Sequence, residues 1–303
     1  MMPDQNTHKV VCFGEVLWDI LPSGAVPGGA PMNVAYHLQK LNKNPALITR
    51  IGIDDKGQQL MNIFSGHGVC TDFFQVDGKY QTGKVFANPN EYNEVVYDIV
   101  KPVAWDFIAW DDSLPDLVAN AGYFVYGSLA ARSKVSKDTL FRLLEMAKNK
   151  VLDINLRAPH YNRRIVEQLL RKADIMKMNL AELELITGWF SNYTSIEDRL
   201  KSIGDKFRLS NLVVTMGGDG ALLLMNGEIT KHPGFKVAVV DTVGSGDAFI
   251  AGLLSQLLDS AGNEATLEFA SGLGAFIATQ RGACPEYDIK KVKELIQNNV
   301  IKI

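Results

Sequence analysis

The sequence predicts an α/β fold with a mostly parallel central sheet and a smaller, separate β-sheet. After Trp110, strand-like apolar runs alternate with helix-like runs, a pattern typical of parallel strands with helices on both faces. Between residues 73 and 100, three strand-like runs follow one another without a helix, which indicates a sheet of their own. A chain of 303 residues can form one large α/β domain or two small ones.

The composition narrows the class of function. With 31 basic and 34 acidic residues the formal net charge is −3, and no basic run is present, so we expect no nucleic-acid partner. Cys12, Cys70 and Cys284 are widely scattered, which gives no metal-binding spacing and fits a reducing cytoplasm. The N-terminus is polar and the longest apolar runs are too short to cross a membrane, so we expect no membrane association.

The first half of the chain predicts a strand at 9–13 and a helix that begins near Pro31, which suits a first helical turn, and ends near Leu41. A strand at 46–52 and a helix at 55–64 follow. The three strand-like runs assigned to the small sheet are 73–76, 82–87 and 94–100, with a turn at Asn88-Pro89-Asn90 before the last one.

The second half predicts strands that alternate with helices. The strands are 123–126, 151–155, 175–178 and 212–216, and the helices are 136–148, 162–172, 248–258 and 264–279. Residues 221–225 and 228–231 form a predicted hairpin, because Asn226-Gly227 suits a two-residue turn. In sheets of this kind, ligands bind outside the carboxyl ends of the strands.

The chain is organised around the glycine-rich stretch 241–249, which lies between a strand-like run at 235–240 and a helix. Gly244 and Gly246 permit an unusual backbone and a close approach to a ligand. The free N–H groups of a helix N-terminus attract an anion, most naturally a phosphate. Asp247 among those donors is a candidate base for a hydroxyl that attacks phosphorus. The alternative is that Asp247 only caps the helix and the glycines only form a turn.

Polar residues near the N-terminus suit a polyhydroxylated ligand. Asp19 lies among apolar neighbours, where its carboxylate can accept hydrogen bonds from two hydroxyls; otherwise it is a turn residue near Pro22. The pair Gly28-Gly29 lets a ligand approach the backbone, and Asn33 can both donate to and accept from a diol. The alternative places Asn33 on a solvated helix face.

Further polar sets follow three predicted strands. Arg157 can hold a sugar oxygen or a phosphate, or it can form an ion pair with Asp153. Asn179 and Glu182 have the spacing of a capping-box variant at the start of a helix. The third set follows the strand predicted at 212–216 and consists of Thr215, Gly217 and Gly220. In the alternative interpretation, these residues form only a glycine turn.

The motif D-T-V-G-S-G-D-A-F-I-A-G at 241–252 resembles the signature of the PfkB, or ribokinase-like, family of carbohydrate and nucleoside kinases. Residues 28–35, G-G-A-P-M-N-V-A, resemble the first signature of the same family, and the resemblance extends from Phe13 to about Pro285. It implies a ribokinase-like three-layer α/β/α fold over one domain, 1–303, with a small β-sheet lid formed by approximately 15–30 and 82–105. The implied reaction transfers the γ-phosphoryl group of ATP to a sugar hydroxyl.

The resemblance also implies roles for single residues. Asp247 would be the catalytic base, and the backbone of Gly244, Ser245 and Gly246 would bind the transferring phosphoryl group. The sugar-binding residues would be Asp19, Gly28, Gly29, Asn33 and Arg157, the last from a match to Asp-Pro-Asn-x-Arg in which Ile154 replaces the proline. Asn179-x-x-Glu182 would order a hydrated Mg²⁺. The nucleotide contacts would be Thr215, Gly217 and Gly220. A monovalent cation such as K⁺ is expected between 241–243 and 281–283.

The resemblance favours one acceptor. Ala30-Pro31 within the first signature looks like the fructokinase branch, which implies D-fructose as the substrate and fructose 6-phosphate as the product. Other acceptors stay open: 2-keto-3-deoxygluconate, a ribose-type sugar or a nucleoside. A sugar sensor without catalysis is a further alternative. An exposed small sheet would also invite pairing of two lids in a homodimer.

Overall fold

The structure, a computed structural model, describes residues 8–21, 24–89 and 95–299. The chain divides into two compact units, one formed by Met1–Phe124 and Ala130–Ala147, the other by Val125–Leu129 and Lys148–Ile303. Three predicted features include residues outside this description: the turn at 88–90, the start of the strand at 94–100, and Pro22.

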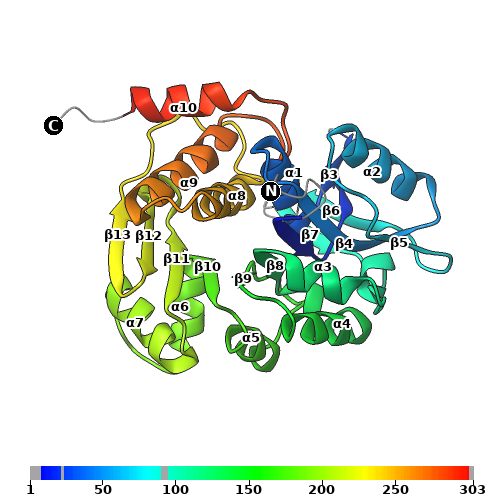
Figure 1. The fold of residues 1–303 in the computed structure, drawn as a ribbon, viewed down its shortest axis with the longest axis horizontal. Helices are drawn as coiled ribbons and strands as arrows, with labels where there is room; N and C mark the ends of the chain where they lie inside the picture. The colour runs from blue at the N-terminus through cyan, green and yellow to red at the C-terminus, as the bar shows by residue number, and fades with distance from the viewer. Residues whose placement is uncertain (1–7, 22–23, 90–94, 300–303) are drawn as a thin grey trace, which may run out of the picture. The chain divides into compact units, whose positions relative to one another are not determined.

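The central strands of the first unit run parallel (Figure 1). β4 (Pro45–Gly52) pairs with β1 (Val10–Phe13) on one side and with β5 (Phe74–Asp77) on the other. The prediction that residues 73–76 belong to the small sheet is therefore wrong. Helix α2 (Asp55–Gly66) separates β4 from β5, so the three elements form a β-α-β crossover, the connection that parallel strands require.

A separate four-stranded sheet in the first unit has the order β3-β2-β6-β7. β2 (Leu17–Leu21) forms an antiparallel hairpin with β3 (Gly24–Gly28) and pairs in parallel with β6 (Gly83–Pro89), which pairs antiparallel with β7 (Val95–Ile99). The sheet is thus built from two stretches far apart in sequence. Helices α1 (Ala30–Lys40), α3 (Leu114–Asn120) and α4 (Lys134–Leu144) complete the unit.

The central strands of the second unit are β9 (Lys150–Asp153), β10 (Ile175–Asn179) and β11 (Asn211–Thr215), which are parallel, followed by the antiparallel strands β12 (Ala221–Met225) and β13 (Glu228–His232). Asn226 and Gly227 have φ values of 54° and 81°, so the predicted hairpin turn is confirmed. Strand β8 (Tyr123–Gly127) contributes residues to both units.

Helices cover both faces of the strands in the second unit (Figure 1). α8 (Ser245–Leu258) and α9 (Asn263–Ala278) pack together on one face, with α10 (Ile289–Asn298) against α9; α6 (Leu180–Gly188) and α7 (Ile196–Phe207) pack on the other. The remaining helix of this unit among the described residues is α5 (Arg163–Leu170). A core cluster joins the strands to the first face through Val213, Leu223, Met225, Phe249, Leu253 and Leu267. The central sheet is mostly parallel and covered by helices, as the sequence predicts.

The strand predicted at 235–240 is absent, although the structure describes all of these residues. Residues 235–240 form no strand, although their composition is β-rich. The backbone N–H of Val240 donates instead to the carbonyl of Ala278 (2.8 Å), at the end of α9. Phe235 is buried against Gly272 of α9, while the side chain of Val239 is 61% exposed, so this segment packs on a helix rather than on a sheet. Within the described residues, no helix is long and apolar enough to cross a membrane.

Candidate active site

The β2–β3 hairpin brings Asp19 against Gly28. Their strands pair Leu17 with Gly28 and Asp19 with Val26, so Asp19 and Gly28 are diagonal neighbours on one face. A Cβ atom on Gly28 would lie 2.1 Å from Oδ2 of Asp19, so a side chain there would occupy the place of the carboxylate. Asp19 lies in the middle of β2, which excludes the alternative that it is a turn residue.

Gly29 is the residue before α1, with a φ of 122°, and a Cβ atom there would lie 2.4 Å from the backbone oxygen of Glu15. The carboxylate of Glu15 accepts a hydrogen bond from the backbone N–H of Ala30 (3.3 Å), which helps to fix the first turn of the helix. Asn33 lies one turn further, with its backbone N–H bound to the carbonyl of Gly29 (2.9 Å). Asn33 is 5% exposed, so the alternative of a solvated helix face is wrong.

The glycine-rich motif forms the N-terminus of α8. Gly244 is the residue before the helix, with a φ of 77°, and a Cβ atom on it would lie 2.5 Å from Cα of Ala283. The hydroxyl of Ser245 donates to the carbonyl of Gly274 (2.8 Å), which ties the turn to α9. Asp247 is the third helical residue and only 9% exposed. The first turn of α8 therefore combines a buried carboxylate with backbone N–H groups of the kind that can bind an anion.

Asp241 fixes the loop that precedes this turn. Its Oδ1 accepts from the backbone N–H of Val243 and its Oδ2 from that of Gly282, both at 3.0 Å. Segments 241–243 and 281–283, between which a monovalent cation is expected, are thus held next to each other. The sequence motif contains Asp241 but gives no indication of this role.

Two charged residues meet across β9 and β10, at the carboxyl end of β9. The strands pair Asp153 with Lys177, and Nζ of Lys177 donates to Oδ1 of Asp153 at 3.2 Å, with both side chains buried. The expected alternative, an ion pair between Asp153 and Arg157, is wrong. Arg157 is exposed in the loop after β9, and its guanidinium donates to the carbonyl of Leu156 at 3.3 Å.

The capping box at the start of α6 forms with both of its hydrogen bonds. The side chain of Asn179 accepts from the N–H of Glu182 (2.9 Å), and Oε2 of Glu182 accepts from the N–H of Asn179 (2.8 Å). Oε1 of Glu182 accepts from the backbone N–H of Leu156 (2.8 Å), so this carboxylate joins the loops after β9 and β10. Burial raises the pKa of Glu182, and the nearby Asp153 raises it further.

Thr215 lies next to Asn179, because these two residues are paired across β10 and β11. The turn that follows places Gly217 at φ 60° and Gly220 at φ 88°. A Cβ atom on Gly220 would lie 1.9 Å from the carbonyl oxygen of His232, so only glycine fits there. A Cβ atom on Gly217 would meet no atom within 4 Å, so the surface beside Gly217 is open.

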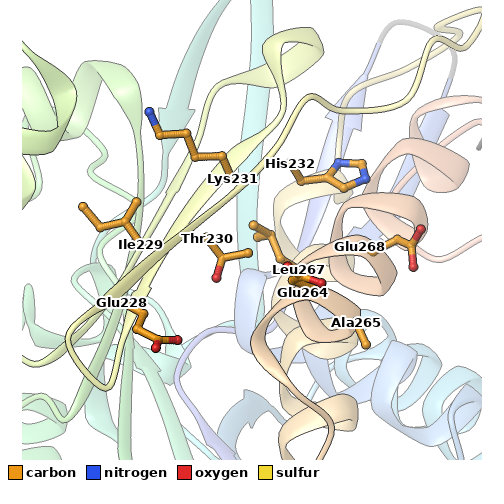
Figure 2. Close-up of a pocket in the computed structure, with 9 residues that line it drawn as sticks. All are labelled: Glu228, Ile229, Thr230, Lys231, His232, Glu264, Ala265, Leu267 and Glu268. Carbon is orange, nitrogen blue, oxygen red and sulfur yellow. The ribbon is translucent and has the colours of Figure 1, made fainter. Parts of the chain in front are cut away.

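Figure 2 shows a groove of the second unit between β13 and α9. Its lining includes Lys231 and His232 from the strand and Glu264 and Glu268 from the helix. Burial lowers the pKa of His232, and Glu268 opposes this effect. Lys231 forms an ion pair with Glu197, a residue outside the groove. The lining contains none of the residues that the sequence predicts as site residues.

The structure thus brings the predicted residues together in two sets, each within one unit. Asp19, Gly28, Gly29 and Asn33 gather around the β2–β3 hairpin and the start of α1. The other predicted residues lie at the N-terminus of α8 and at the carboxyl ends of β9, β10 and β11. Lys177 was not predicted. The sequence feature that could have indicated Lys177 is its place inside an apolar strand, Ile175–Asn179, two residues before the capping box.

Known proteins are similar to this chain over most of its length. A family model described as "pfkB family carbohydrate kinase" matches residues 8–290. A protein named probable fructokinase-6, chloroplastic, from Arabidopsis thaliana is 30% identical over 316 residues, which cover 95% of this chain and 82% of that protein. A fructokinase from Klebsiella pneumoniae is 28% identical, with coverage of 91% and 94%.

Solved structures agree with the fold. A fructokinase from Xylella fastidiosa with bound ATP superposes with a TM-score of 0.84 at 23% identity, covering 96% of this chain and 99% of that one. A fructokinase from Vibrio cholerae O395, solved with fructose, ADP and calcium ion, gives a TM-score of 0.80 at 24% identity, with coverage of 95% and 98%. A double mutant of a Vibrio cholerae O395 fructokinase was solved with fructose, ADP and potassium ion. These likenesses confirm the predicted fold.

Proposed function

Because the chain belongs to the PfkB family of carbohydrate kinases, we propose that it transfers the γ-phosphoryl group of ATP to D-fructose and forms fructose 6-phosphate. The observation that carries the proposal is the N-terminus of α8, where Asp247, which is 9% exposed, is the third residue of a helix that begins with a glycine-rich turn. The choice of fructose is supported by relatives named fructokinase, one of which is 30% identical over 95% of this chain.

The acceptor sugar is proposed to bind the set of the first unit. The carboxylate of Asp19 accepts hydrogen bonds from two hydroxyls, and the absence of a side chain at Gly28 leaves room for that carboxylate. Gly29 exposes backbone to the ligand, and the amide of Asn33 donates to one hydroxyl and accepts from another. Arg157, exposed after β9, is the candidate for a contact with a sugar or phosphate oxygen.

Phosphoryl transfer is proposed to occur at the N-terminus of α8. The acceptor oxygen forms a bond to the γ-phosphorus, the bond between that phosphorus and the oxygen of ADP breaks, and the hydroxyl proton moves to Asp247. The backbone amides of Gly244, Gly246 and Asp247 are proposed to donate to the oxygens of the transferring group. Ser245 is held within this turn, because its backbone N–H donates to the carbonyl of Thr242 (3.2 Å) and its hydroxyl donates to that of Gly274. Positioning and fixed donors supply most of the rate enhancement in this chemistry.

ATP is proposed to lie along the carboxyl ends of β10 and β11, where Asn179, Thr215, Gly217 and Gly220 are gathered. Each carboxylate oxygen of Glu182 accepts one backbone amide and retains a lone pair, so it can also accept from a water of a hydrated Mg²⁺. Mg²⁺ would neutralise charge on the phosphates of ATP. A monovalent cation such as K⁺ would lie between the segments that Asp241 joins.

The proposed function includes two features of the protein outside the reaction. The small sheet is proposed to act as a lid over the sugar and to pair with a second copy through an edge strand, β3 or β7, in a homodimer. Light scattering of the purified protein tests the dimer. A cytoplasmic location is proposed as well, supported by the wide scatter of Cys12, Cys70 and Cys284 along the sequence.

The experiment that tests the function is ADP release from Mg-ATP with a panel of acceptors: fructose, glucose, ribose, tagatose, 2-keto-3-deoxygluconate and adenosine. The expected result is a preference for fructose. Preference for another acceptor would keep the kinase reaction and contradict the substrate. A folded protein that binds a sugar but releases no ADP with any acceptor would contradict the reaction and favour a sensor.

A further inference from the structure

Lys177 is a charged residue in the middle of a buried strand. It is 7% exposed and lies in β10 between the fully buried side chains of Met176 and Met178. Removing an ammonium group from water is costly, and a buried ion pair is often no more stable than apolar residues of similar volume. Stability of the fold therefore does not by itself explain a lysine at this position.

The pair with Asp153 fixes the position of the ammonium group. Asp153 is the register partner of Lys177 on β9, and its Oδ1 accepts from Nζ at 3.2 Å. Among the described residues, Oδ2 of Asp153 has no hydrogen-bond partner, although it is buried. An ammonium group carries three donors, so the bond to Asp153 leaves donors for a ligand.

Gly246 shows where the ammonium group points. Gly246 is absent from the glycines with positive φ, so its helical backbone conformation would accept any ordinary residue. A Cβ atom on Gly246, however, would lie 2.9 Å from Nζ of Lys177 and 3.9 Å from its Cε. The ammonium group therefore lies directly beside the second residue of α8, within the turn that is proposed to bind the transferring phosphoryl group.

The surroundings keep Lys177 protonated. Burial by itself would lower its pKa, but attraction by Asp153, Glu182 and Asp247 outweighs burial, and the pKa is raised above its usual value. The buried cation is thus attracted by three carboxylates, of which Asp153 is in direct contact with it. A permanent positive charge at this place is the kind of group that stabilises negative charge on a transferring phosphoryl group.

We propose that Lys177 is a further catalytic residue, whose ammonium group contacts the oxygens of the transferring phosphoryl group beside Gly246, with Asp153 as its positioning residue. The inference rests on the proposed phosphoryl transfer and adds a donor to it. Lys177 stays protonated throughout, because the proton of the acceptor hydroxyl moves to Asp247. Lysine is suited to this role, because its ammonium group is a compact positive charge with three donors that can turn toward phosphate oxygens.

The test replaces the charge and keeps the shape with Lys177→Met, since methionines already flank this position in β10. We expect kcat to fall by about 10²–10³-fold, as for the loss of one oxyanion donor. The KM for the acceptor should change little. Binding provides a second measurement: titration calorimetry with fructose present should show weaker binding of ADP with fluoroaluminate, which mimics the transferring group, and unchanged binding of ADP alone.

The double variant Asp153→Asn, Lys177→Met distinguishes a catalytic role of Lys177 from a structural one. It removes both charges of the pair, so no unpaired buried charge is left. If the ammonium group is catalytic, this variant folds as the wild type does but stays as slow as Lys177→Met. If Lys177 only neutralises Asp153, the double variant regains wild-type turnover, and the inference is overturned. Equal affinity of the single variant and the wild type for ADP with fluoroaluminate would overturn it too. An inactive wild type would instead refute the proposed function.

Discussion

Replacing Gly28 by alanine tests whether the β2–β3 hairpin holds the acceptor sugar. The new Cβ atom would lie 2.1 Å from Oδ2 and 3.1 Å from Cγ of Asp19, so the carboxylate must move by about 1 Å or more to reach ordinary contact. The carboxylate is the end of a side chain at a half-buried position, so the movement is possible without unfolding. The hydrogen bonds that it is proposed to make with two hydroxyls would then be misplaced.

The expected loss follows from these bonds. Each hydrogen bond to a charged group contributes roughly 1.5–3 kcal/mol, so weakening two of them by half raises the KM for fructose by at least about 10-fold and up to about 10²-fold. The KM for ATP should stay within about twofold, because Gly28 belongs to the set proposed for the sugar.

Steady-state kinetics with each substrate varied in turn measures both constants. Gly66→Ala is the matched control, since a Cβ atom on Gly66, at the end of α2, would meet no atom within 4 Å. An unchanged KM for fructose in a folded Gly28→Ala variant would refute the role of this hairpin. An equal effect on the KM for ATP would indicate a structural role for Gly28 instead.

Two further predictions concern stability. The guanidinium of Arg132 donates to both carboxylate oxygens of Asp106, at 2.7 and 2.9 Å, and both side chains are buried. Arg132→Met should therefore lower the free energy of unfolding, measured by urea denaturation, by about 3–5 kcal/mol. A loss below about 1 kcal/mol would contradict this prediction. Burial acts to raise the pKa of Asp54, but hydrogen bonds from Thr82 and Gly57 outweigh it, and the pKa is lowered. The ionised carboxylate therefore stabilises the fold above the unfolded pKa of about 3.9, and this contribution is lost as pH falls through the lower folded pKa. The stability difference between wild type and Asp54→Asn should narrow from pH 5 to pH 3, and a constant difference would contradict the assignment.

Local sequence patterns were sufficient to predict most helices and strands and to identify the members of each set of site residues. Asp19 and Gly28 were predicted separately, each from its own neighbours, but their contact depends on the register of the β2–β3 hairpin. The capping box of Asn179 and Glu182 was predictable because both hydrogen bonds are local. Helix α7 was not predicted, although Ser195 accepts from the N–H of Asp198 in the local pattern that marks its start.

Long-range pairing explains the errors. Arg157 is nearer to Asp153 in sequence than Lys177 is, but the parallel pairing of β9 with β10 gives Asp153 to Lys177. The β-rich composition of residues 235–240 predicted a strand, but the bond from Val240 to Ala278 places this segment on α9. Neither pairing has a signal within a short window of sequence, so both required the folded structure.

The central claim is that Asp247 accepts the proton of the attacking hydroxyl. The most direct test compares the single-turnover rate of fructose phosphate formation in the wild type and in Asp247→Asn, with ATP affinity measured by calorimetry and Asp205→Asn, on the exposed face of α7, as a control. The rate of Asp247→Asn should fall by about 10²–10⁴-fold, with ATP affinity nearly unchanged and the control active. A rate near that of the wild type would remove Asp247 from the reaction and contradict the proposed mechanism.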